Sequence, residues 1–212
     1  MDILPQLLDL VLHLDAHLAA FVADYGAWVY ALLFAIVFME TGLVVTPFLP
    51  GDTLLFVAGA VAAAGGMDLP WLMATLIAAA LCGDNVNFWV GRLLGPRIFR
   101  HESNRWLKRE NLERTHAFME RHGLKAIVIA RFVPLVRTFM PFACGIGRLS
   151  YPRFIAFSLL GAVLWVGLLV PAGFLFGNLA WIKANLTAVI LLIVLLSLSP
   201  GLLQYLRQRR AA

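Results

Sequence analysis

The stretch 38–52, FMETGLVVTPFLPGD, interrupts the first long apolar segment of the chain. Residues 26–49 are almost entirely apolar, yet they contain one acid, Glu40. The stretch ends in residues that break helices: Pro47, Pro50 and Gly51. Because proline removes a helix hydrogen bond and clashes with the preceding turn, no helix is expected to continue through this point. The apolar run that follows is too short to cross a bilayer, so residues 26–66 are predicted to form a re-entrant hairpin.

The segment 124–150 repeats this irregularity with the opposite charge. Arg131 and Arg137 lie six residues apart, with Pro134 between them. On a straight helix the two arginines would point roughly 120° apart, whereas a backbone break at Pro134 would let them converge. Two more residues typical of a helix break or of close backbone approach follow, Pro141 and Gly145. This segment is therefore predicted to form a second re-entrant hairpin.

Three other segments are apolar and long enough to span a bilayer: 69–94, 154–176 and 181–203. Residues 1–24 place acids and histidines among leucines, which predicts an amphipathic helix at the membrane surface. Residues 96–122 combine seven bases with four acids and predict a second amphipathic surface segment. A basic tail, 204–212, ends the chain.

Composition and charge place the chain in a membrane. Hydrophobic residues make up 61% of the chain and charged residues 14%, whereas soluble domains carry ~25% charged residues. This excludes a soluble enzyme and a disordered tail. Residues 1–91 hold eight acids and no Lys or Arg, and all 17 bases fall between Arg92 and Arg210. Because basic residues near spans stay cytoplasmic, the central basic segment and the C-terminus are predicted to be cytoplasmic.

This topology gives the two hairpins opposite orientations. The order of amphipathic helix, hairpin and span then occurs twice, as in inverted-repeat transporters. We therefore expect an all-α integral membrane protein with a single domain, 1–212, and about three full spans. The repeat is one of element order, and the two halves show no evident similarity residue by residue. The sequence contains no basic stretch with interleaved aromatic residues, so nucleic-acid binding is not predicted.

Four ionisable residues fall where hydrocarbon is expected: Glu40, Asp52, Arg131 and Arg137. Each costs roughly 2.5–3.5 kcal/mol if it is left unpaired at the bilayer centre. The planar arginine fork binds phosphate or carboxylate with two hydrogen bonds and remains charged. The arginines are therefore predicted to bind an anionic group, and the acids to gate the site or couple it to protons. The alternative is that the four charges only form ion pairs that hold the hairpins together.

Other residues are predicted to have supporting roles. Asp84 and Asn87, in the span 69–94, are expected to make interhelical hydrogen bonds. Gly83, Gly91 and Gly95 are expected to allow close helix approach. Four tryptophans are predicted to be interface anchors or to face lipid: Trp71, Trp106, Trp165 and Trp181. No spacing of His, Cys, Asp or Glu predicts a metal site, and no cofactor is expected.

Three motifs together resemble one family. They are Phe38-Met39-Glu40 with Pro50-Gly51-Asp52, then Gly83-Asp84 with Gly91-Arg92-Leu93-Leu94-Gly95, and then Arg131 to Thr138, RFVPLVRT, with Gly145. Their order and spacing, from about residue 25 to 178, are similar to the DedA (VTT) family of bacterial membrane proteins. The chain departs from the family pattern at four positions: Ala130, Cys144, Leu149 and Ser158, the last standing where many members have asparagine.

The resemblance implies a role in envelope integrity and in growth that depends on the proton motive force. Some members are implicated in returning undecaprenyl phosphate across the inner membrane, and eukaryotic relatives are lipid scramblases. The essential acids and arginines of the family correspond here to Glu40, Asp52, Arg131 and Arg137.

The function predicted from these observations is translocation of a lipid phosphate, either undecaprenyl phosphate or a phospholipid, with coupling to the proton motive force. The alternative is a proton- or cation-coupled antiporter that supports envelope homeostasis. A lipid phosphatase is disfavoured because no histidine neighbours the arginines. A purely structural role would predict that exchanging the charges of Glu40 and Arg131 restores function.

Overall fold

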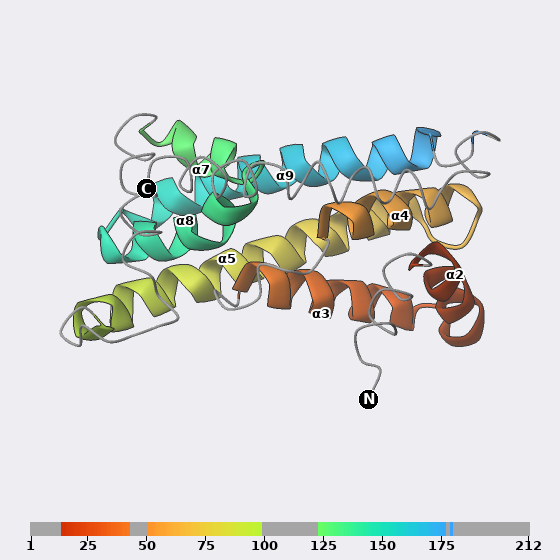
Figure 1. Cartoon of the computed structure of the whole chain (residues 1–212), viewed down its shortest axis with the longest axis horizontal. Helices are drawn as coiled ribbons and strands as arrows, with labels where there is room; N and C mark the ends of the chain where they lie inside the picture. Colours follow the sequence, from red (N-terminus) through yellow and green to blue (C-terminus); the bar gives the residue numbers. More distant parts are fainter. Residues whose placement is uncertain (1–13, 43–50, 99–122, 177–178, 180–212) are drawn as a thin grey trace, which may run out of the picture. The chain divides into compact units, whose positions relative to one another are not determined.

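A computed structural model describes residues 14–42, 51–98, 123–176 and 179 (Figure 1). All regular structure in these residues is helical, which confirms the predicted all-α class. The helices are α2 (Leu14–Tyr25), α3 (Trp28–Gly42), α4 (Gly51–Ala63), α5 (Leu69–Ile98), α7 (Lys125–Ala130), α8 (Pro134–Ile146) and α9 (Tyr151–Phe176).

Two of these helices are long and apolar enough to cross a membrane. The apolar part of α5 is Leu69–Leu93, with a mean hydropathy of 1.4, and α9 reaches a mean hydropathy of 2.3. A helix of the length of α9, 26 residues, is about 39 Å long, which exceeds the roughly 30 Å of a hydrocarbon core. The predicted span 181–203, the tail and most of segments 1–24 and 96–122 lie outside the described residues.

The backbone is interrupted within 124–150 at the position of Pro134. Helix α7 ends at Ala130, and Val133 is extended, with φ −117° and ψ 104°. Pro134 then occupies the first turn of α8, where its missing N–H removes no helix hydrogen bond. Pro141 differs from the expectation, because it lies inside α8 and the helix continues through it. The helix continues there although a proline nitrogen cannot donate a helix hydrogen bond.

The described residues group into two compact units. Unit 1 contains residues 14–35, 51–76 and 166–176, and unit 2 contains residues 36–42, 77–98 and 123–165. The long helices α5 and α9, and also α3, contribute residues to both units.

In unit 1, α4 and α9 approach each other closely at two glycines. A Cβ on Gly59 would overlap the carbonyl oxygen of Val170, and a Cβ on Gly173 would overlap the carbonyl oxygen of Phe56. The contact is reciprocal, since each helix places a glycine against a carbonyl of the other. In both helices the contacting carbonyl belongs to the residue three positions before the glycine.

Unit 2 contains the same arrangement between α5 and α8. A Cβ on Gly91 would overlap the carbonyl oxygen of Phe142, and a Cβ on Gly145 would overlap that of Phe88. The spacing of three residues from carbonyl to glycine is again present in both helices. Gly83 of α5 also has no room for a side chain, because a Cβ there would overlap Thr41. The close approach expected at Gly83 and Gly91 is therefore present.

Candidate functional site

The interior of unit 2 is rich in polar side chains. Among the described residues, seven of the eight polar or charged residues that are buried belong to this unit. They are Glu40, Thr41, Asp84, Asn87, Arg131, Thr138 and Ser158. Four different helices and the turn after α7 supply these residues. Arg137 joins them through an ion pair with Glu40.

The first buried ion pair links α3 to α8. Arg137 Nη2 donates to Glu40 Oε1 at 2.5 Å, and the side chains are 9% and 1% exposed. Glu40 is the single acid of the apolar helix α3 and lies two residues before the helix ends at Gly42. Arg137 lies on the first turn of α8, immediately after the break at Pro134. The sequence predicted both residues at the site, and the structure brings them together.

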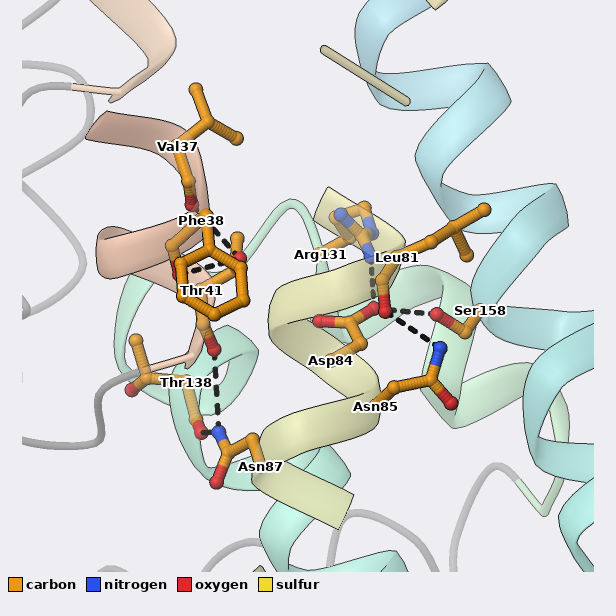
Figure 2. Close-up of polar contacts among 10 residues, drawn as sticks. All are labelled: Val37, Phe38, Thr41, Leu81, Asp84, Asn85, Asn87, Arg131, Thr138 and Ser158. Carbon is orange, nitrogen blue, oxygen red and sulfur yellow. Dashed lines mark hydrogen bonds and ion pairs between the residues drawn. The ribbon is translucent and has the colours of Figure 1, made fainter. Parts of the chain in front are cut away.

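The second buried ion pair links α5 to the turn after α7. Arg131 Nη2 donates to Asp84 Oδ2, with both side chains nearly inaccessible to solvent. Ser158 of α9 donates its hydroxyl to the same carboxylate oxygen at 2.5 Å. Figure 2 shows Asp84 projecting from α5 with Arg131 and Ser158 both directed at it. One oxygen therefore receives a cationic donor and a neutral donor from different elements.

The ring of Trp165 lies against both arginines. The guanidinium carbon of Arg131 is 5.7 Å from the ring centroid, and that of Arg137 is 5.3 Å from it. Each distance is within the range of a cation–π contact. Trp165 is 1% exposed, so the prediction that it is an interface anchor or faces lipid is wrong. Trp71, for which the same was predicted, is 70% exposed.

Asn87 ties three helices together. Its side-chain amide donates to the carbonyl of Thr138 in α8 at 2.8 Å and to that of Thr41 in α3 at 3.4 Å (Figure 2). Asn87 and Asp84 are three residues apart on α5 and therefore share a helix face. On this face of α5, Asp84 takes part in the ion pair with Arg131. Asn87 binds the backbone of Thr41 and Thr138, the residues that follow the other ion pair, Glu40 and Arg137.

The remaining predicted site residues are distributed differently. Asp52 belongs to unit 1, where it is half-buried in the first turn of α4. Gly51 begins that helix and is buried. Gly145 packs against the backbone of Phe88, as described above. Pro47 and Pro50 lie outside the described residues.

Three residues of the cluster have roles beyond those that the sequence predicts. Asp84 makes the predicted interhelical hydrogen bond, with Ser158 of α9, and it is also the carboxylate that pairs with Arg131. A signal for this existed, because Asp84 is an acid within a span whose neighbouring polar residues are neutral amides. Ser158 carried a weaker signal, because it stands where many members of the resembling family have asparagine, and Trp165 carried none, since tryptophan is not unusual in an apolar helix.

The cluster carries no net charge, since two carboxylates face two guanidiniums. Within it, Arg131 Nη1 is buried and has no hydrogen-bond partner among the residues described. Such a group is suited to an anionic oxygen. In the same part of the chain, no group of three or more His, Cys, Asp or Glu residues is placed to hold a metal ion.

Comparison with known proteins identifies the family. The VTT domain matches residues 49–175 of this chain. The chain is also 49% identical to Protein DedA of Escherichia coli K12, over 100% of this chain and 98% of that protein. The chain belongs to the DedA family. This confirms the resemblance that the three sequence motifs indicated.

Other relatives in this family are described as membrane proteins. The inner membrane protein YqjA of Escherichia coli K12 is 34% identical over 84% of this chain and 80% of its own length. An uncharacterized membrane protein of Mycobacterium leprae is 39% identical over 79% of this chain and 75% of its own length. No solved structure matches this DedA-family chain. Together with the apolar helices α5 and α9, these relatives show that it is a membrane protein.

Proposed function

We propose that this protein moves a lipid phosphate across the bacterial inner membrane and that Arg131 and Arg137 hold the phosphate. The observation that carries the proposal is the pair of guanidiniums in contact with one buried tryptophan ring. Arginine binds phosphate with two parallel hydrogen bonds and keeps its charge away from water. The substrate would be undecaprenyl phosphate or a phospholipid, whose apolar tail would stay in the bilayer.

Transport suits this cluster better than hydrolysis does. Cleavage of a phosphate ester needs a nucleophile and a proton donor beside the phosphate, commonly a histidine. None of the described residues of unit 2 is a histidine. The residues around the arginines instead include carboxylates that already pair with them, which suits reversible binding of an anion.

Coupling to the proton motive force follows from the charge of the cluster. Because its two acids and two arginines cancel, a phosphate would add one or two negative charges to a buried region. An uncompensated buried charge is costly. Proton uptake by Glu40 or Asp84 would restore neutrality as the phosphate enters. Asp52, the half-buried acid of unit 1, would gate access or serve as a further proton carrier.

We further propose that residues 26–66 and 124–150 are opposed re-entrant hairpins in an inverted repeat within one domain, with the central basic segment and the C-terminus in the cytoplasm. The reciprocal glycine contacts support this proposal. In unit 1 the second arm of the first hairpin, α4, packs on α9, and in unit 2 the second arm of the other hairpin, α8, packs on α5. The second arm of each proposed hairpin thus packs on the span that follows the other segment, which supports a twofold relation between the two halves of the sequence.

The test is lipid movement in proteoliposomes that contain a prenyl phosphate and an imposed proton gradient. Arg131→Ala and Arg137→Ala should each abolish movement of the lipid between leaflets, while Arg153→Ala, an exposed arginine of α9, should transport normally. Each variant must first elute as a monodisperse protein. Normal transport by both of the first two variants would refute the proposal.

The alternative is a proton- or cation-coupled antiporter. The observation that favours it is the neutrality of the cluster without any anionic ligand, since the arginines could simply balance acids that carry ions. Proteoliposomes that lack prenyl phosphate separate the two functions. Cation-driven proton movement in them would support the antiporter, and a strict requirement for the lipid phosphate would support lipid transport.

A further inference from the structure

One terminal nitrogen of the Arg131 guanidinium makes no hydrogen bond within the described part of the protein. Its side chain is 4% exposed, and Nη2 donates to Asp84. Its other terminal nitrogen, Nη1, is buried and has no partner in the described part of the chain. Buried polar atoms are rarely left unsatisfied, and an unsatisfied charged donor is the costliest kind. This nitrogen therefore marks a position where an acceptor from outside the protein would bind.

Asp84, in contrast, has more than one donor. Its Oδ2 accepts from Arg131 and also from the hydroxyl of Ser158, which comes from a different helix. The carboxylate would therefore keep one hydrogen bond if the arginine turned to another anion. Ser158 thus lowers the cost of separating Asp84 from Arg131, because a buried carboxylate with no donor would be strongly disfavoured.

We propose that Asp84 is an internal anion that occupies half of a phosphate site on Arg131. A phosphate oxygen binds Nη1 first, and a second oxygen then displaces Asp84 from Nη2, which completes the two-bond arrangement that arginine forms with phosphate. Ser158 retains the displaced carboxylate. This inference rests on the proposed function, and it assigns Asp84 and Ser158 to positioning roles that act on the ligand through Arg131.

Equilibrium binding to the full-length protein in nanodiscs tests the proposal, with inorganic phosphate and a prenyl monophosphate titrated separately. Asp84→Asn removes the competing charge and should tighten phosphate binding by about tenfold, the effect of roughly one charge-assisted hydrogen bond. Ser158→Ala should weaken binding several-fold, because Asp84 then depends on Arg131 alone. A structural role for both residues would weaken binding in both variants, so the opposite signs are diagnostic.

Two matched controls accompany these variants. Asp68→Asn changes an exposed acid whose side chain accepts from the backbone of Trp71, a bond that asparagine can replace. Ser150→Ala changes an exposed serine. Both controls should bind phosphate as the wild type does. The gain from Asp84→Asn should also vanish in an Arg131→Gln background, because the competition acts through that arginine.

The outcomes distinguish this inference from the proposed function. Binding by Asp84→Asn that is no tighter than wild type, or by Ser158→Ala that is no weaker, overturns the exchange. If Asp84→Asn fails to fold, Ser158→Ala decides the question, since it keeps all four charges. A wild-type protein that binds neither probe refutes the proposed function. Expected shifts with inorganic phosphate but none with the prenyl monophosphate would support exchange at a free-phosphate site and refute a prenyl phosphate as the substrate.

Discussion

Units 1 and 2 share a packing device but differ in what they bury. In each unit two helices approach through reciprocal contacts between glycines and carbonyls. Yet of the buried polar or charged residues in the described parts of the chain, unit 1 holds Thr53 alone and unit 2 holds the other seven. Close helix packing in this protein therefore does not require buried charge.

Unit 2 also has an apolar core of its own. Phe88 of α5 stacks on Phe154 of α9 with ring centroids 4.4 Å apart. Around this pair lie buried side chains from α7 and α8: Ala126, Ile127, Ala130, Met140 and Cys144. A buried ion pair often contributes less to stability than apolar residues of the same volume would. The charges of unit 2 are therefore better explained by function than by stability.

The largest expected effect comes from breaking one ion pair. Arg137→Met leaves Glu40 buried without its charge partner and should lower the free energy of unfolding by about 3–5 kcal/mol. The double variant Glu40→Gln with Arg137→Met should recover most of that loss but should not transport. Denaturant unfolding in detergent micelles measures both values. A double variant as unstable as the single one would mean that the ion pair itself stabilises unit 2. That result would contradict the view that the charges of unit 2 serve function rather than stability.

An intermediate effect is expected from filling the glycine contacts. Gly59→Ala in unit 1 and Gly145→Ala in unit 2 should each cost about 1–3 kcal/mol, because the added methyl group overlaps a backbone carbonyl. Thermal unfolding should show similar losses in the two units. Gly167→Ala is the control, since no atom lies within 4 Å of its added Cβ, and it should be neutral or slightly stabilising. A large loss confined to one unit would contradict a shared packing device.

The smallest effect should follow from Trp165→Phe. Phenylalanine keeps an aromatic face but interacts more weakly with the two guanidiniums, so stability should fall by about 1 kcal/mol. Lipid-phosphate affinity should change with it, because the ring lies against both arginines. Trp71→Phe, which alters a largely exposed ring, should change neither quantity. Equal effects of the two substitutions would show that Trp165 has no specific role in the site.

Much of the fold could be predicted because its signals are local. Apolar length located α5 and α9, and proline chemistry located the interruption at Pro134. Pro141 shows the limit of such reasoning, because the same residue type lies inside a continuous helix. Whether a proline breaks a helix depends on how well its surroundings tolerate one missing hydrogen bond, and sequence does not report that.

The candidate site was predictable in its residue types but not in its pairing. Glu40, Arg131 and Arg137 were identifiable because charge is rare in apolar segments. Their partners lie far along the chain, 97 residues from Glu40 to Arg137 and 47 from Asp84 to Arg131, so only the tertiary fold selects them. Trp165 was misassigned for a related reason. Its burial depends on the rotation of α9, which exposes its neighbours Val163 and Leu164.

The long separation within each ion pair has a consequence for biosynthesis. Glu40 leaves the ribosome 97 residues before Arg137, an interval of about 5–20 s at ordinary rates of translation. During that interval Arg137, the partner of Glu40 in the folded protein, has not yet been made. The site therefore cannot assemble as its helices enter the membrane one by one. It closes only after α9, which supplies Ser158 and Trp165, has been made, so its formation is a late step that follows insertion.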